Sequence, residues 1–251
     1  MIPFIELTKK EIRRFMTIWI QTVIGPVTTA LLYQLIFGQQ LLSVPTGIPG
    51  VNYATFLIPG LIMMQVILNA FGNSSSSMIQ SKYTGNIIFV LMAPISPFAT
   101  YSAFLVSSIV RGIIVGVAVF LAIGWFGVMI PKAPLVLIYF LIIGSAIGAG
   151  LGMIIGIISE KFDQLAGFQS FIITPLIYLA GVFFNSHGFS GIWYYLAQLD
   201  PFLYIVDGFR YGFIQHSNAN VMFGAIFTLS LAIIINLIGY MLIKKGVKIK
   251  N

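Results

Sequence analysis

The chain has 251 residues, of which 59% are apolar and only 8% are charged. A soluble domain carries about 25% charged residues, so this composition excludes a soluble globule. The formal net charge is +7, but the basic residues flank apolar segments, which argues against a nucleic-acid partner. Cysteine is absent, which excludes disulfides, thiolate metal sites and a cysteine nucleophile.

Six stretches are apolar enough to cross a hydrocarbon core, which takes about 20 helical residues. They span residues 18–42, 53–71, 101–130, 135–158, 165–184 and 221–243. The sequence therefore predicts an all-α membrane protein with six transmembrane helices, organised as a single domain over residues 1–251. We expect no cleaved signal peptide, because the first apolar run is long and lacks a small-residue cleavage site.

The basic residues predict the orientation in the membrane. Six spans place both termini on one side, and cytoplasmic loops are enriched in Lys and Arg. Of the 13 basic residues, ten lie at the termini or in the loops after the second and fourth spans. Lys132 and Arg210 fall on the other side, and Arg111 lies within the third span. We therefore expect both termini in the cytoplasm.

Residues 1–17 have the pattern of an amphipathic helix. The apolar side chains gather near one helical face: Ile5, Ile12, Phe15 and Met16. Four charged side chains gather on the opposite face: Glu6, Lys9, Lys10 and Arg13. Such a helix lies in the membrane interface with its apolar face down. The alternative is a simple basic flank of the first span.

Prolines and glycines punctuate the spans. Pro26 and Pro59 lie within the first and second spans and predict kinks. Glycines recur every fourth residue in two spans: Gly112 and Gly116 in the third, and Gly144, Gly148, Gly152 and Gly156 in the fourth. Small residues at this interval allow two helix backbones to approach closely, so the stripe predicts tight helix packing.

The loop at residues 82–97 contains a short apolar run after Gly85 and Asn86, and Pro94 and Pro97 stop it. Six helical residues cover about 9 Å, which is far too short to cross a bilayer. A short apolar helix on the cytoplasmic side needs a hydrophobic groove. A partner protein or the lipid interface would both supply one.

Residues 175–213 combine the end of a span with two short aromatic segments on the outer side. Asp200 before Pro201 has the form of an N-cap followed by proline at the first helical position. This pattern predicts a helix from Pro201 to about Phe213. Asp207 and Arg210 are three residues apart and share a helical face. We interpret them as an exposed structural ion pair, and the alternative makes their helix a lid over an exit path.

Four sequence features together resemble the membrane subunit of ABC-2 type exporters, most closely the YadH-like branch. These are the basic amphipathic N-terminus, the KxxGN loop ending in APIS, the PLIYLAGVFF stretch and the LDPFLYIVDGFR stretch. Their order and spacing match the family over nearly the whole chain. The resemblance implies a permease in a bacterial inner membrane that works with a second copy of itself and with two copies of an ABC ATPase subunit.

The resemblance also implies roles for particular segments. The loop at 82–97 would hold a coupling helix that docks on the ATPase: Lys82, Gly85, Asn86, Ile87, Ile88, Phe89, Leu91 and Pro94. Segments at 185–213 would form short re-entrant helices of an exoplasmic gate: Phe183, Phe184, Trp193, Asp200, Pro201, Asp207 and Arg210. ATP and Mg²⁺ would bind the partner, because this chain has no P-loop motif, and we expect no cofactor or metal on the chain itself.

The candidate substrate path comprises Tyr33, Phe37 and Arg111. Arg111 either faces an anionic head group or extends towards the cytoplasmic surface. We favour a hydrophobic or amphiphilic substrate, such as a lipid or a drug-like molecule. The alternatives are a lipid-linked polysaccharide and, with less support, a secondary transporter, since no acidic residue lies inside a clear span. A membrane enzyme using His187 and His216 fits no ligand spacing.

Overall fold

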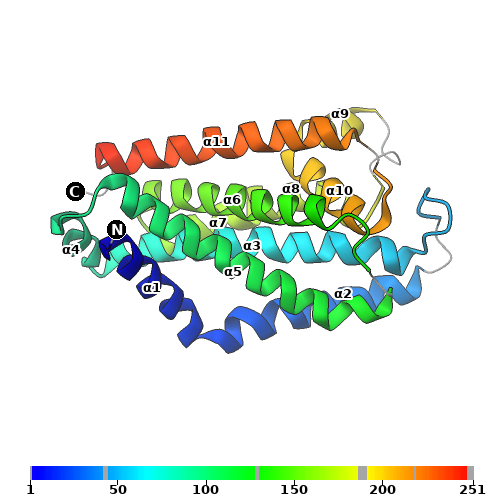
Figure 1. Cartoon of the computed structure of the whole chain (residues 1–251), viewed down its shortest axis with the longest axis horizontal. Coiled ribbons are helices and arrows are strands. Elements are labelled where there is room, and N and C mark those ends of the chain that lie inside the picture. The colour runs from blue at the N-terminus through cyan, green and yellow to red at the C-terminus, as the bar shows by residue number, and fades with distance from the viewer. Residues whose placement is uncertain (1, 42–44, 128–129, 186–190, 218, 248–251) are drawn as a thin grey trace.

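In the computed structural model, the chain is a bundle of helices that run along its longest axis (Figure 1). The structure describes residues 2–41, 45–127, 130–185, 191–217 and 219–247, and within these ranges it contains helices and turns but no strand. The helix α4, the start of α1 and the end of α11 share one end of the bundle, whereas α9 and α10 lie towards the other (Figure 1). The predicted all-α class is confirmed for this part of the chain.

The helices follow one another along the chain as α1 (Ile2–Thr17), η1 (Ile20–Ile24), α2 (Gly25–Gln40), α3 (Tyr53–Tyr83), α4 (Asn86–Met92), α5 (Pro97–Ile123), η2 (Gly124–Phe126), α6 (Pro134–Ile158), α7 (Phe162–Phe168), η3 (Gln169–Ile173), α8 (Thr174–Leu179), α9 (Ile192–Leu199), α10 (Pro201–Ile214) and α11 (Val221–Lys245).

Five helical segments of the described chain are long and apolar enough to cross a membrane: Ile20–Gln40, Tyr53–Tyr83, Pro97–Phe126, Pro134–Ile158 and Val221–Lys245. Six were predicted from the sequence. The stretch expected to be the fifth of the six forms the consecutive helices α7, η3 and α8, which end at Leu179. The chain then turns at Gly181, where a φ of 75° suits glycine. The six-span arrangement stays a prediction.

Two π-helical turns precede prolines. The turn η1 comes directly before α2, where Pro26 lies in the first turn, and η3 comes directly before α8, where Pro175 has the same place. Proline lacks a backbone N–H and its ring clashes with the preceding turn, and a π-turn relieves that local conflict. Pro59, in contrast, lies inside α3, whose helix continues through it to Tyr83.

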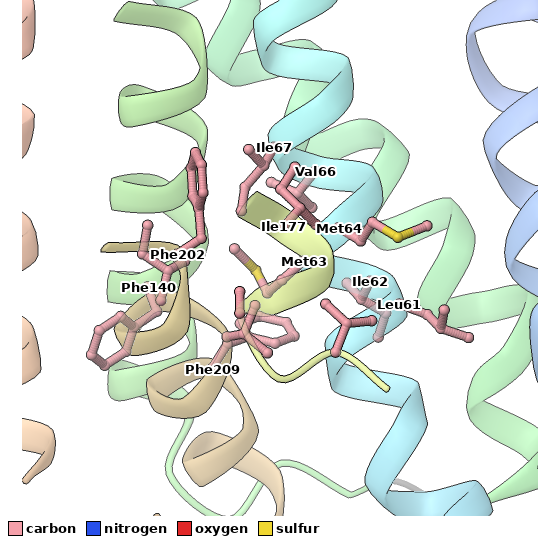
Figure 2. Packing of buried hydrophobic residues seen from close by; sticks show 14 of the residues in the cluster. Leu61, Ile62, Met63, Met64, Val66, Ile67, Phe140, Ile177, Phe202 and Phe209 are labelled. Atoms are coloured by element: carbon pink, nitrogen blue, oxygen red, sulfur yellow. The ribbon is translucent and has the colours of Figure 1, made fainter. Parts of the chain in front are cut away.

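The helix α3 forms the centre of the bundle, and nearly all of its side chains are buried. Figure 2 shows its Met63 and Ile67 packed with Phe140 of α6, Ile177 of α8 and Phe202 of α10. The helix begins at an N-cap, where the side chain of Asn52 accepts a hydrogen bond from the backbone N–H of Thr55. The helices α2, α5, α6 and α10 therefore pack around α3.

The glycine stripe of α6 packs against α3, as its spacing predicts. A methyl group at Gly148 would lie 2.8 Å from the carbonyl oxygen of Ile67, and one at Gly156 would lie 2.9 Å from that of Ser75. In α5, a methyl group at Gly112 would lie 2.9 Å from the hydroxyl of Ser145 on α6. The absence of side chains lets the helix backbones come this close.

The helix α3 is longer than the predicted span at 53–71, because its polar end is also buried. The hydroxyl of Ser74 donates to the carbonyl oxygen of Ala149 on α6 at 2.8 Å, and that of Ser75 donates to Phe71 at 2.7 Å. Asn73 donates to the hydroxyl of Ser108 on α5 at 2.9 Å. These bonds satisfy the polar groups inside the bundle, so the helix continues to Tyr83.

Candidate functional site

An aromatic pocket of about 300 Å³ lies where α2, the start of α3, α8 and the chain after α8 meet. Four of the seven residues that line it were predicted site residues, and the other three were not. The seven are Tyr33, Phe37, Leu41, Tyr53, Tyr178, Phe183 and Phe184. Two predicted path residues, Tyr33 and Phe37, therefore share one pocket with two predicted gate residues, Phe183 and Phe184.

The ring of Phe183 is the centre of this pocket. Its centroid lies 5.4 Å from that of Tyr33, 5.5 Å from that of Phe37 and 5.6 Å from that of Tyr178, each in an edge-to-face arrangement. Edge-to-face packing at this separation is favourable between aromatic rings. The segment after α8 is thus joined to α2 through a cluster of rings.

Two hydroxyl contacts add polarity at the pocket. The hydroxyls of Tyr33 and Tyr178 lie 3.3 Å apart, and the hydroxyl of Tyr53 donates to the carbonyl oxygen of Phe183 at 2.8 Å. The residues that line the pocket carry no formal charge. An apolar cavity with a few hydroxyls suits a hydrophobic or amphiphilic molecule better than an ion.

Three further pocket residues were not predicted from the sequence: Leu41, Tyr53 and Tyr178. Tyr178 belongs to the quoted PLIYLAGVFF stretch, and Tyr53 opens the second predicted span. Their convergence depends on how α2, α3 and α8 pack, and no spacing within one segment reports that packing.

The helix α10 begins as predicted. Asp200 is its N-cap, and Oδ1 accepts a hydrogen bond from the backbone N–H of Phe202 at 2.9 Å, with Pro201 in the first turn. The helix ends at Ile214, one residue beyond the expected end. Trp193 lies on α9 with an exposed side chain and does not line the aromatic pocket.

The interpretation of Asp207 and Arg210 as an exposed pair is wrong, because both side chains are buried. Asp207 is 3% exposed and Arg210 is 2% exposed, and Asp207 Oδ1 lies 3.8 Å from Arg210 Nη1. The helix α10 packs against α3, α6 and α11, which cover this face. Burial lowers the pKa of Arg210 to about 10 while Asp207 raises it, so the guanidinium stays charged at neutral pH.

Arg210 connects three parts of the chain. Its Nη2 donates to the carbonyl oxygen of Gly181 at 2.6 Å, and its Nε donates to that of Phe56 at 3.3 Å. Its guanidinium carbon lies 3.9 Å from the centroid of the Phe56 ring, a cation–π distance. Asp207 Oδ2 accepts hydrogen bonds from the Ser217 hydroxyl and the Ala219 backbone N–H. The pair therefore braces α10 against α3, the turn at Gly181 and the connection to α11.

Asp200 is buried, and burial raises its pKa from 3.8 to about 7, although the hydrogen bond from Phe202 opposes this change. As pH rises from about 4 to about 7, the folded protein keeps this proton while the unfolded chain loses it. The free energy of unfolding therefore decreases across this window.

We predict that Asp200→Asn removes this pH dependence. Asparagine caps helices as well as aspartate does, so the two proteins should unfold alike below about pH 4. Above about pH 7 the variant should be more stable by roughly 2–4 kcal/mol. Thermal unfolding of the detergent-purified proteins across pH 4–8 measures the difference. A difference that does not change with pH would contradict the prediction.

The predicted coupling residues lie around α4. The ammonium group of Lys82 donates to the carbonyl oxygens of Ile157 and Ser159, both at 2.7 Å, at the end of α6. Gly85 precedes the helix with a φ of 72°, and Asn86 begins it. Pro94 follows the end of the helix at Met92.

Some side chains of α4 are buried in the protein, and others are exposed on its surface. Ile87 is buried, whereas Ile88 is 54% exposed and Phe89 is 73% exposed. Leu91 belongs to the same helix, and its side chain lies outside the described part of the structure. The helix thus presents an apolar face at the end of the bundle where α1 begins and α11 ends (Figure 1).

Arg111 does not join Tyr33 and Phe37. It lies on α5, where its guanidinium contacts Asn69 and Asn73 of α3 beside Arg14 of α1. Among the described residues no group of three or more His, Asp or Glu side chains is arranged to hold a metal ion. His187 lies outside the described residues.

Five long apolar helices are the pattern of an integral membrane protein. The family model of the ABC-2 type transporter matches residues 3–214, and the chain belongs to this family. It is similar to the inner membrane transport permease YadH of Escherichia coli strain K12, with 37% identity over 206 residues, which cover 82% of this chain and 80% of the relative. The permease of the same name in Shigella flexneri matches equally well over the same shares of both chains.

Proposed function

We propose that this chain is the membrane subunit of an exporter that moves a hydrophobic or amphiphilic molecule, such as a lipid or a drug-like compound, outward across a bacterial inner membrane. A separate ABC ATPase, present in two copies, would bind Mg²⁺ and hydrolyse ATP. Membership of the ABC-2 type transporter family supports this proposal. The inner membrane location rests on relatives that are named inner membrane transport permeases.

The observation that carries the substrate proposal is the uncharged aromatic pocket between α2, α3 and α8. A cavity of about 300 Å³ accommodates part of an acyl chain or an aromatic group, and the hydroxyls of Tyr33, Tyr53 and Tyr178 are near enough to contact a polar end. Aromatic faces also stack on sugar rings. A lipid-linked polysaccharide is therefore the second candidate.

We place the pocket at the boundary between two copies of this chain. It adjoins α2, whose side chains are largely exposed, including Leu32, Leu35 and Ile36. In this arrangement α7, η3 and α8 act as the fifth of six crossings, both termini are cytoplasmic, and α1 lies at the inner membrane surface. The basic residues at both ends of the chain support that orientation.

The helix α4 would dock on the ATPase. Phe89 is 73% exposed and Met92 is 78% exposed, and such apolar side chains at the end of a bundle favour a protein groove. On the opposite side α9 and α10 would form the re-entrant gate, with Trp193 on the outer surface. The brace between Asp207 and Arg210 would keep α10 in register with the pocket.

The experiment that tests this proposal is reconstitution of the tagged chain, with the ATPase that co-purifies from its native membrane, in lipid vesicles. We expect ATP to drive movement of a fluorescent amphiphile towards the exoplasmic side. Phe89→Asp should abolish co-purification and transport, because a charge would be placed in an apolar contact.

Leu135→Asp is the matched control, since Leu135 is exposed at the first turn of α6, away from α4. It should leave co-purification unchanged. If no P-loop ATPase co-purifies with the unmodified chain, the ATP-driven mechanism is contradicted. If ATP drives a glycolipid but no simple amphiphile, the polysaccharide alternative replaces the proposed substrate.

A further inference from the structure

Two arginines meet at the junction of α1, α3 and α5. Nη2 of Arg14 donates to Oδ1 of Asn73 at 2.8 Å and to the carbonyl oxygen of the same residue at 3.1 Å. From the other side, Nη1 of Arg111 approaches the same Oδ1 at 3.4 Å, and its Nη2 approaches Oδ1 of Asn69 at 3.3 Å. Two positive groups therefore converge on one neutral amide.

The charges at this junction do not balance. The carboxylate of Glu11 is buried, and its Oε2 contacts Arg14 Nε at 3.1 Å and accepts from the Ser77 hydroxyl. Within the described chain Arg111 makes no ion pair, and its Nε is buried without a hydrogen-bond partner. A cation in this environment is costly without a counter-charge.

The junction lies in the half of α3 that is nearer to α4. Asn73 is ten residues before the end of α3 at Tyr83, which corresponds to about 15 Å along the helix from the end nearest α4. The chain that follows Arg14 exposes large apolar side chains, with Trp19 52% and Ile20 58% exposed. A charged site thus adjoins a surface suited to acyl chains.

We propose that Arg14 and Arg111 bind the phosphate group of a membrane phospholipid, whose acyl chains lie along the apolar surface at Trp19 and Ile20. A phosphate offers several acceptor oxygens to the planar fork of a guanidinium, which makes it a strong ligand for paired arginines. It would supply the missing negative charge beside the two guanidinium groups. The bound lipid would hold α1 against α3 and α5.

This site is separate from the aromatic pocket and goes beyond the proposed transport function. None of the pocket residues belongs to it. The proposal of a lipid site depends on the charge balance beside α1. It is therefore independent of whether the chain exports amphiphiles.

The test measures ligand-dependent thermal stabilisation of the delipidated protein in detergent. Short-chain phosphatidylglycerol should raise the melting temperature saturably. Arg111→Gln should weaken this effect at least about tenfold, because charge-assisted hydrogen bonds to the phosphate are lost. The Arg111→Gln protein should still fold, since no carboxylate of the described residues pairs with Arg111 and would lose its cation. Arg111→Lys keeps the positive charge but lacks the planar guanidinium, so it should also bind the lipid more weakly. This variant provides the test if Arg111→Gln cannot be purified.

Arg13→Gln is the matched control, because Arg13 precedes Arg14 on the same helix and is exposed. It should bind phosphatidylglycerol within about twofold of the unmodified protein. Equal weakening by Arg13→Gln and Arg111→Gln would overturn the site, as would unchanged binding by Arg111→Gln. Stabilisation by inorganic phosphate alone at equal concentration would overturn the lipid source, and stabilisation by short-chain diacylglycerol would overturn the role of phosphate.

Discussion

Replacing Arg210 with methionine should lower the free energy of unfolding by about 3–5 kcal/mol, since the substitution leaves a buried carboxylate without its cation. Asp207 is only 3% exposed, so water does not replace the lost charge. The carbonyl oxygens of Gly181 and Phe56 would also lose their donor. Methionine has a similar length and fills much of the space, which limits the effect of lost packing.

Chemical or thermal unfolding of the detergent-purified protein measures this change. Lys132→Met removes a cation from an exposed position and should change stability by less than about 0.5 kcal/mol. Asp207→Asn combined with Arg210→Met should recover part of the loss, because no buried charge remains unpaired. An Arg210→Met protein as stable as the unmodified one would show that the pair is not a brace.

Arg210 stabilises the fold and also holds the chain segment that forms one wall of the aromatic pocket. Its bond to Gly181 fixes the turn that leads to Phe183, and Phe183 is the centre of the aromatic cluster. Its contacts with Phe56 fix the same turn to the first turns of α3. A displacement of α10 would therefore require a rearrangement of the pocket wall.

Sequence patterns correctly predicted the structural features that depend only on residues close together in the chain. The cap at Asp200 and the start of α10 needed only an acid before a proline, and the close packing of α6 needed only glycines at every fourth position. The burial of Asp207 and Arg210 was not predictable in this way. The carbonyl groups that Arg210 contacts belong to Phe56 and Gly181, which are far away in the chain.

The same distinction applies to the candidate site. Tyr33 and Phe37 were chosen as aromatic residues of one span, and Phe183 as part of one motif, but only the packing of α2 against the turn after α8 brings them together. Arg111 was grouped with them because it is a charge inside a span. The structure instead places it beside Arg14, since α1 folds back along α5.

The second large effect concerns the contact between α6 and α3. In Gly152→Ala the new methyl group would overlap the Ser74 hydroxyl and the Phe71 carbonyl oxygen. Backbone atoms of a central helix cannot move away without disturbing their own hydrogen bonds. We therefore expect a loss of about 1–3 kcal/mol or more, although alanine favours helix by about 1 kcal/mol over glycine.

Gly72→Ala is the natural control for this substitution, because Gly72 lies inside α3 with nothing near the added methyl group. It should stabilise the protein by up to about 1 kcal/mol through helix propensity alone. The same chemical change is thus expected to have opposite signs at two glycines of the same bundle. Parallel unfolding curves of both variants test this directly, and a Gly152→Ala protein at least as stable as Gly72→Ala would mean that α3 and α6 are not in close contact at this point.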